Sequence, residues 1–160
     1  MNINEGMNLR GEYIIEARDA LTGRLIKRYR LNNMLMAISR STRVQMLQGI
    51  YAGATTDLEI KYFALGSDAT PAADTQTQLL AETFRKIYTK QTLINPSTLQ
   101  TVCSIGAGEA NFTIREIGVF CGSEATASAN SGIMLSRVNV NIIKNANIVL
   151  NVTRNDICAI

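Results

Sequence analysis

The chain has 160 residues, of which 46% are hydrophobic and 18% are charged, so it is expected to be globular and not disordered. It contains neither histidine nor tryptophan, which excludes Ser-His-Asp and Cys-His catalytic groups and a core built on many large aromatic side chains. The net charge is +3, and the three cysteines show no CxxC spacing; they are expected to be small buried hydrophobic residues, not disulfides or metal ligands.

The chain begins with a predicted arm and a predicted hairpin. Residues 1–9 are polar and are expected to form a flexible arm. Apolar and polar residues alternate over residues 11–18 and again over residues 24–31. The turn sequence Asp-Ala-Leu-Thr-Gly at 19–23 separates the two runs, which indicates a β-hairpin.

A helix is predicted for residues 34–49, which lack proline and are rich in Met, Ala, Leu and Arg. Asn32 and Asn33 precede it and are candidate caps. Its apolar residues form only an approximate stripe, which indicates that one face packs on a sheet or on a neighbouring subunit. We interpret residues 10–50, the hairpin and the helix, as a unit distinct from the rest of the chain.

From residue 57 onward the pattern is that of strands, because apolar and polar residues alternate in short runs. The turn sequence Asn-Pro-Ser at 95–97 and the loops at 67–78 and 123–132 separate these runs. The predicted strands are residues 58–64, 84–93, 99–105, 111–121, 133–140 and 146–152. The predicted fold class is therefore mainly β: an antiparallel β-sandwich over residues 51–160, with an N-terminal β-hairpin and one helix.

The sequence shows no pattern typical of catalysis, metal binding or a membrane segment. It has no Gly-rich phosphate-binding loop and no Asp or Glu spacing typical of a cation site. No apolar run approaches 18 residues, and the N-terminus has no apolar signal segment. We expect a protein that is not an enzyme, spans no membrane, and uses no cofactor and no metal; paired carboxylates of the glycosidase kind are the alternative that stays open.

Four charged residues stand where structural ion pairs are expected. Glu82 and Arg85 have i,i+3 spacing, which suits either an exposed pair on one helical turn or an inward-facing bidentate pair. Glu116 shares a predicted strand face with apolar residues, so its carboxylate must be paired or hydrogen-bonded. Arg85 or Arg137 is the expected partner of Glu116. We interpret the four residues as a structural clasp and not as a catalytic group.

Four short motifs occur in a fixed order in the second half of the chain. They are Phe-Ala-Leu-Gly at 63–66, Leu-Ala-Glu-Thr-Phe-Arg at 80–85, Arg-Glu-Ile-Gly-Val-Phe at 115–120 and Leu-Ser-Arg at 135–137. With these motifs, residues 60–152 resemble the N-terminal attachment domain of phage tail-collar fibre proteins.

This resemblance implies a structural virion protein of a tailed bacteriophage. Such a protein would be an attachment or adaptor subunit of the tail fibre, collar or baseplate, and would act by binding other virion proteins. The resemblance also implies a homo-oligomer, a trimer or a hexamer, made in the host cytoplasm and located in the phage tail or neck.

Residues 10–50 lie outside the part that resembles this family, and extra elements on a sandwich often make assembly contacts. The basic residues of the second hairpin strand alternate with apolar ones, which is typical of a solvated strand face. A partner of opposite charge is the alternative interpretation of these residues; among such partners, nucleic acid is not expected. The candidate assembly residues are Arg24, Lys27, Arg28, Arg30, Leu35 and Ile38.

Two alternatives keep the sandwich and change its role. A receptor- or carbohydrate-recognition module is one, but such modules usually present aromatic platforms, and this chain has five Tyr, four Phe and no Trp. A capsid or head-fibre protein is the other, with the same structural role at another place in the particle. The sequence does not distinguish neck, tail tip and capsid.

Overall fold

The computed structural model describes residues 8–47 and 58–159 of the chain. Its elements, in chain order, are β1 (Asn8–Asp19), β2 (Leu25–Asn32), β3 (Met34–Leu35), α1 (Ala37–Leu47), β4 (Ile60–Gly66), β5 (Glu82–Ile87), β6 (Lys90–Asn95), β7 (Thr98–Ile105), β8 (Thr113–Cys121), β9 (Ile133–Ile143) and β10 (Ile148–Ala159).

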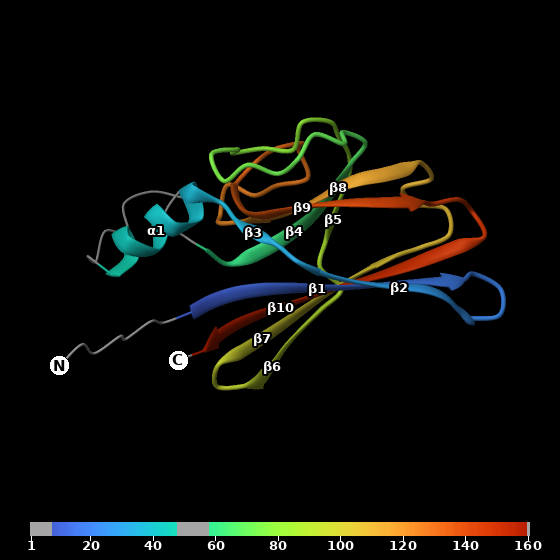
Figure 1. The fold of residues 1–160 in the computed structure, drawn as a ribbon, viewed down its shortest axis with the longest axis horizontal. Helices are drawn as coiled ribbons and strands as arrows, with labels where there is room; N and C mark the ends of the chain where they lie inside the picture. Colours follow the sequence, from blue (N-terminus) through green and yellow to red (C-terminus); the bar gives the residue numbers. More distant parts are fainter. Residues whose placement is uncertain (1–7, 48–57, 160) are drawn as a thin grey trace.

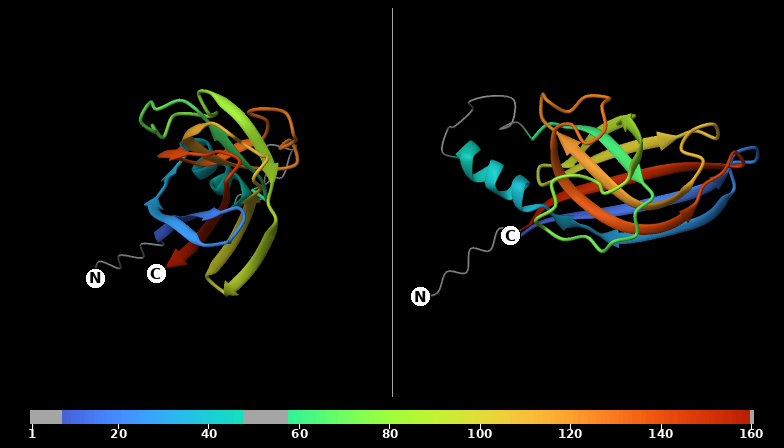
Figure 2. Two further views of the ribbon diagram at one scale, coloured as in Figure 1. Left: turned by 90° about the vertical axis from the view of Figure 1, so that its right-hand side faces the viewer. Right: turned by 90° about the horizontal axis from the view of Figure 1, so that it is seen from above.

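Two five-stranded antiparallel sheets pack face to face (Figure 1). Sheet A has the strand order β2-β1-β10-β7-β6, and sheet B has the order β3-β9-β8-β4-β5. Helix α1 lies beside the end of the sandwich where β1 begins and β10 ends (Figure 2). The structure confirms the predicted fold class, a mainly β antiparallel sandwich with a hairpin and one helix.

The N-terminal hairpin forms as the alternation predicts. Strands β1 and β2 pair antiparallel from Glu12 opposite Asn32 to Arg18 opposite Leu25. In the turn, a carboxylate oxygen of Asp19 accepts the backbone N–H groups of the second and third residues after it, as Asp does in tight turns. Gly23 has a φ of 70°, which a residue without a side chain adopts at little cost.

The division of the chain at residue 50 is wrong as a description of the fold. Strand β1 lies between β2 and β10 in sheet A, and it pairs with β10 over its whole length, from Asn8 opposite Ala159 to Asp19 opposite Ile148. Residues 10–19 are therefore an integral part of the sandwich. Of the predicted arm, residues 8 and 9 belong to β1, and residues 1–7 lie outside the described residues.

The predicted helix begins three residues later than expected. Met34 and Leu35 form β3, which pairs with β9, and α1 begins at Ala37. Neither asparagine caps it: Ala37 donates its N–H to the carbonyl of Asp74, and Ser39 Oγ donates to the carbonyl of Leu135 on β9. The helix start is thus fixed by tertiary contacts, and its predicted end at residue 49 lies outside the described residues.

The predicted strand 84–93 is two strands in different sheets. Strand β5 belongs to sheet B and β6 to sheet A. The chain crosses between them where the Tyr88 N–H bonds to the carbonyl of Lys61 and the Thr89 N–H bonds to the carbonyl of Val102. The apolar residues between Phe84 and Leu93 alternate only loosely, and the prediction of a single strand did not take the adjacent Ile87 and Tyr88 as a break.

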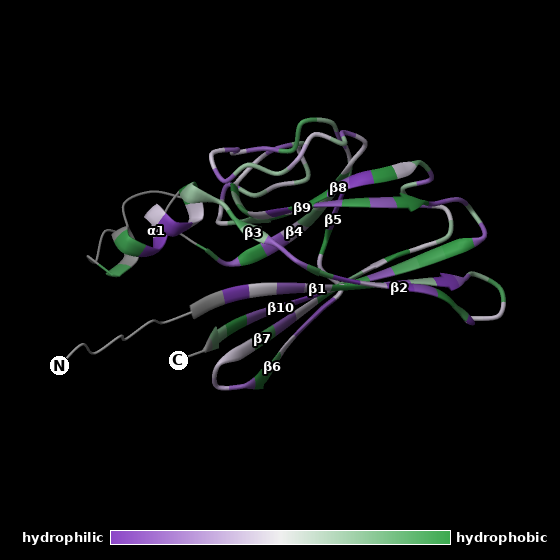
Figure 3. Cartoon of the chain, viewed as in Figure 1, coloured by the Kyte–Doolittle hydropathy of each residue, from purple (hydrophilic) through white to green (hydrophobic). Residues whose placement is uncertain are grey.

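Two hydrophobic cores result from this arrangement, and hydropathy alternates along the strands accordingly (Figure 3). The inner core lies between the sheets and includes Tyr13, Ile15, Phe63, Ile117 and Val152. A smaller outer core lies on the other face of sheet B. Its buried members are Met36, Ala64, Leu79, Phe120, Ala125 and Met134.

The central place of β1 predicts that its two faces contribute unequally to stability. Ile15 is fully buried in the inner core, whereas its neighbour Ile14 points to the opposite face and is half-buried. We expect Ile15→Ala to lower the free energy of unfolding by about 2–5 kcal/mol and Ile14→Ala by about 1 kcal/mol or less. Urea unfolding followed by circular dichroism measures both. Equal losses would contradict the assignment of faces.

Candidate functional site

Two loops cover the face of sheet B that points away from sheet A (Figure 1). They are residues 67–81, between β4 and β5, and residues 122–132, between β8 and β9. Both loops lie over the outer core, and each is held by a buried ion pair. The four charged residues singled out in the sequence make these two pairs.

Glu116 reaches this face through an irregularity in β8. The register against β9 shifts between Ile114 and Glu116, so Ile114 lies in the inner core and Glu116 on the outer face. Phe112 packs on the inner core, whereas Phe120 belongs to the outer core. The apolar residues expected to share a face with Glu116 were Phe112, Ile114, Gly118 and Phe120, and this expectation is wrong for Phe112 and Ile114.

Glu116 and Arg137 form a fully buried ion pair, each with 0% of its side chain exposed. Arg137 Nε donates to Glu116 Oε2 over 2.9 Å. The other carboxylate oxygen accepts the backbone N–H of Ala81 at 2.7 Å, and Oε2 also accepts the N–H of Leu80 at 3.2 Å. A buried carboxylate is stable here because both of its oxygens are bonded.

Arg137 extends this bonding into the loop 67–81. Its Nη1 donates to the side chain of Gln76 at 3.0 Å, and its Nη2 donates to the carbonyl of Thr70 at 3.0 Å. Gly66 precedes the loop, and a Cβ there would collide with the Glu116 carboxylate and with the carbonyl of Ala81. The loop is thus held at its beginning, middle and end by one buried ion pair.

Glu82 and Arg85 make the second pair, on β5. The two side chains are 2% and 3% exposed, and they meet in a bidentate contact of 2.7 and 3.0 Å. The register against β4 skips Thr83, and this bulge brings positions 82 and 85 to the same face of the strand. The pair is the inward-facing bidentate one; the helical turn considered as its alternative does not form.

Arg85 and Glu82 hold the loop 122–132. Arg85 Nη1 donates to the carbonyl groups of Thr126 and Ser131, and Glu82 Oε2 accepts the N–H of Asn130 at 2.8 Å. The guanidinium also lies 4.1 Å from the centre of the Phe120 ring. The structure therefore brings Arg85 to Glu82 and Arg137 to Glu116, and it does not bring Arg85 to Glu116.

A further buried charge, Arg154 on β10, escaped the sequence analysis because the predicted strand ended at residue 152. Its guanidinium points into the inner core, where it contacts Asp156, the Tyr13 hydroxyl and Ser136 Oγ. Burial raises the pKa of Tyr13. Burial alone would lower the pKa of Arg154, but Tyr13 and Asp156 raise it, so it stays charged. The signal that could have shown it is the alternation continuing past Val152.

The candidate assembly residues on β2 lie at one edge of sheet A. Arg24 and Arg30 are exposed. Arg28 pairs with Glu16 at 2.5 Å, and the Lys27 ammonium lies over the ring of Tyr29. The structure thus leaves a basic edge that is accessible to a partner.

The two apolar candidates are covered within the chain. Leu35 packs against the inner core, and Ile38 packs against the outer core. Both are half-buried, so neither offers its full surface to a partner.

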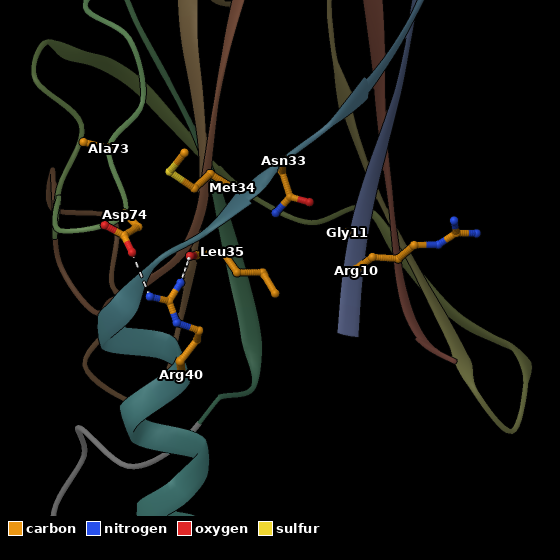
Figure 4. Close-up of a pocket in the computed structure, with 8 residues that line it drawn as sticks. All are labelled: Arg10, Gly11, Asn33, Met34, Leu35, Arg40, Ala73 and Asp74. Carbon is orange, nitrogen blue, oxygen red and sulfur yellow. Dashed lines mark hydrogen bonds and ion pairs between the residues drawn. The ribbon is translucent and has the colours of Figure 1, made fainter. Parts of the chain in front are cut away.

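A groove of about 580 Å³ separates the start of β1 from β3 and α1 (Figure 4). On its α1 side, Arg40 pairs with Asp74 at 2.8 Å and bonds the carbonyl of Leu35. On its β1 side, the buried amide of Asn33 lies against Gly11, where a Cβ would collide with it. The lining surface of the groove is mainly apolar, and its charged groups are Arg10, Arg40 and Asp74.

Within the described residues, no three His, Cys, Asp or Glu side chains gather as a metal site would require. The same residues contain no helix that is long and apolar enough to cross a membrane. None of the three cysteines forms a disulfide, and burial raises the pKa of Cys103 to about 12. A thiol with such a pKa is protonated at neutral pH and unreactive.

No family model, no curated protein and no solved structure matches the chain. The similarity to tail-collar fibre proteins therefore depends on the ordered motifs of the sequence alone.

Because the Glu116–Arg137 pair is buried, replacing Arg137 by an uncharged residue should lower the free energy of unfolding strongly. Arg137→Met leaves a carboxylate buried without its counter-ion, which is expected to lower the free energy of unfolding by about 3–5 kcal/mol. Lys86→Met is the control, because it breaks a pair with Glu109 that is about one-third exposed and should lose about 1 kcal/mol or less. Similar losses in urea unfolding would contradict a structural role for Arg137.

The Glu82–Arg85 pair predicts protection of one loop. Residues 122–132 are rich in Ala and Ser, after which elastase cleaves. Arg85→Gln removes the bonds to this loop, so elastase should cut within it faster than in the wild-type protein. Arg28→Gln, which breaks an exposed pair on sheet A, is the control and should leave the rate unchanged. Mass spectrometry of the fragments locates the cuts; unchanged cleavage of the Arg85 variant would show that the pair does not hold the loop.

Proposed function

We propose that the protein is a structural virion protein of a tailed bacteriophage, an attachment or adaptor subunit of the tail fibre, collar or baseplate. The single observation that carries this proposal is the ordered set of four motifs. In the structure these motifs coincide with β4, the start of β5, β8 and β9, all in sheet B. They also contain Glu82, Arg85, Glu116 and Arg137. Motifs that are far apart in the sequence thus belong to one sheet, which supports treating them as a single family signature.

The use of the buried charges supports a role in binding and not in catalysis. Both ion pairs on sheet B bond to loop backbone, and Arg154 bonds across the inner core. Charges engaged in this way fix the shape of loops and sheets. A module whose loops are held by buried ion pairs suits a subunit that docks on other virion proteins.

The basic edge of sheet A is the surface we assign to a heterologous partner. Arg24, Lys27, Arg28 and Arg30 lie along β2 or directly before it, and Glu16 neutralises one of them. An acidic protein surface on the tail or neck would complement the remaining charge, with an association that weakens as salt rises.

Labelling of whole particles tests this function. Antibodies raised against the purified protein, coupled to gold, should mark the tail or neck of phage particles in the electron microscope. Label on the head would favour the capsid or head-fibre alternative. Absence from purified particles, in both labelling and mass spectrometry of the particle proteins, would overturn the proposal. Binding on a glycan array would instead favour the recognition module.

A further inference from the structure

We propose that the exposed edge strand β6 is a self-association surface. It pairs antiparallel with β6 of a second copy of this chain, so that sheet A continues across a two-fold axis. This inference deepens the proposed function, because it assigns a surface to the expected homo-oligomer. Within the described part of the chain, β6 is hydrogen-bonded to a strand on one side only, which leaves its other edge open to a partner strand.

Two of the six residues of this edge strand are exposed apolar side chains, and the others, Lys90, Gln91, Thr92 and Asn95, are polar. Leu93 and Ile94 of β6 are 67% and 53% exposed, and Ile87, at the end of β5 just before the chain crosses to sheet A, is 55% exposed. The β6–β7 hairpin projects from the margin of the molecule (Figure 2, left view, yellow-green). An edge strand with exposed apolar side chains is a surface for pairing with another strand.

The opposite edge of the same sheet shows how this chain prevents such pairing. Strand β2 and the residue before it carry four basic residues, which would repel the same edge of a second copy. Residues 87–95 contain a single charge, Lys90. The two edges thus differ in the property that decides whether a strand can pair with its own copy.

Charge also selects the occupant of the β6 edge. Residues 87–95 contain no acidic residue, so a β2 edge docked there would have its cations uncompensated. In an antiparallel pair of two β6 strands, the two copies of Lys90 lie toward opposite ends of the joint, and Leu93 and Ile94 lie where the apolar stretches can meet. The contact is isologous and closes after two copies, unlike a β2–β6 contact, which would continue into a filament.

Of the two expected oligomers, a trimer and a hexamer, a two-fold contact fits the hexamer. It joins two trimers into a hexamer of dihedral symmetry, or two single chains into a dimer. It does not occur within a simple trimer.

Two isoleucines offer a matched test of the edges. Ile94 on β6 and Ile26 on β2 are 53% and 52% exposed, and each is the extra residue at a register shift of its edge strand. A lysine at either position adds the same charge to an equally exposed bulge of the same sheet. Only the substitution on the edge that forms the interface should lower the mass of the oligomer.

The experiment measures the mass of the full chain by light scattering at a low and a high protein concentration. We expect the wild-type mass at high concentration to be an even multiple of 17.5 kDa, Ile94→Lys to halve it, and Ile26→Lys to leave it unchanged. Thermal unfolding checks that both variants fold; Leu93→Lys replaces Ile94→Lys if the latter does not.

A monomeric wild-type protein at both concentrations would overturn the inference, and so would an oligomer that Ile94→Lys and Leu93→Lys leave intact. These results are independent of the gold labelling. A trimer that is insensitive to both variants, together with label on the tail, would reject the β6 interface and support the proposed function. A dimer that Ile94→Lys dissociates, formed by a protein that is absent from purified particles, would support the β6 interface and reject the proposed function.

Discussion

The rest of the structure depends on the requirement that buried charges be fully bonded. Glu116 and Arg137 lie in the middle strands of sheet B, on a face that two loops cover, and neither reaches water. A charge in that position is stable only if every lone pair and N–H finds a partner. Side chains alone do not supply enough partners, so the backbone of the loop 67–81 supplies the rest. The loop conformation follows from the bonding needs of the ion pair.

This constraint explains why loops without regular structure can cover a hydrophobic core. Phe120 of β8 is fully buried beneath the loops, and Leu79 of the loop 67–81 is buried with it, yet loops expose polar backbone that is costly to bury. The ion pairs satisfy part of that backbone, because the carboxylates accept hydrogen bonds from its N–H groups and the guanidinium groups donate to its carbonyl groups. Apolar residues of the same volume could fill the space with equal or greater stability, but they would not fix the path of the chain. The charged pairs therefore specify one loop conformation.

The sequence predicted those parts of the fold that depend on local alternation. Strands β1, β2, β7 and β8 and the need of Glu116 for a cation all follow from neighbours within a few residues. Other features depend on distant contacts. Strand β1 is central because β10, more than a hundred residues later, pairs with it. The crossing at Tyr88 takes the chain from sheet B to sheet A, and the register shift before Glu116 changes which face of β8 a residue lies on.

The pairing of β1 with β10 sets an order on the synthesis of the protein. The ribosome makes β1 more than a hundred residues before its long partner strand β10, so sheet A is left without its β1–β10 pair until residue 159 has been made. The hairpin of β1 and β2 can form early, but one of its edges then stays unsatisfied for most of translation. Nascent chains would expose that edge, and compact folding is expected only once β10 has left the ribosome. A chaperone that shields a single apolar strand would find its substrate in this intermediate.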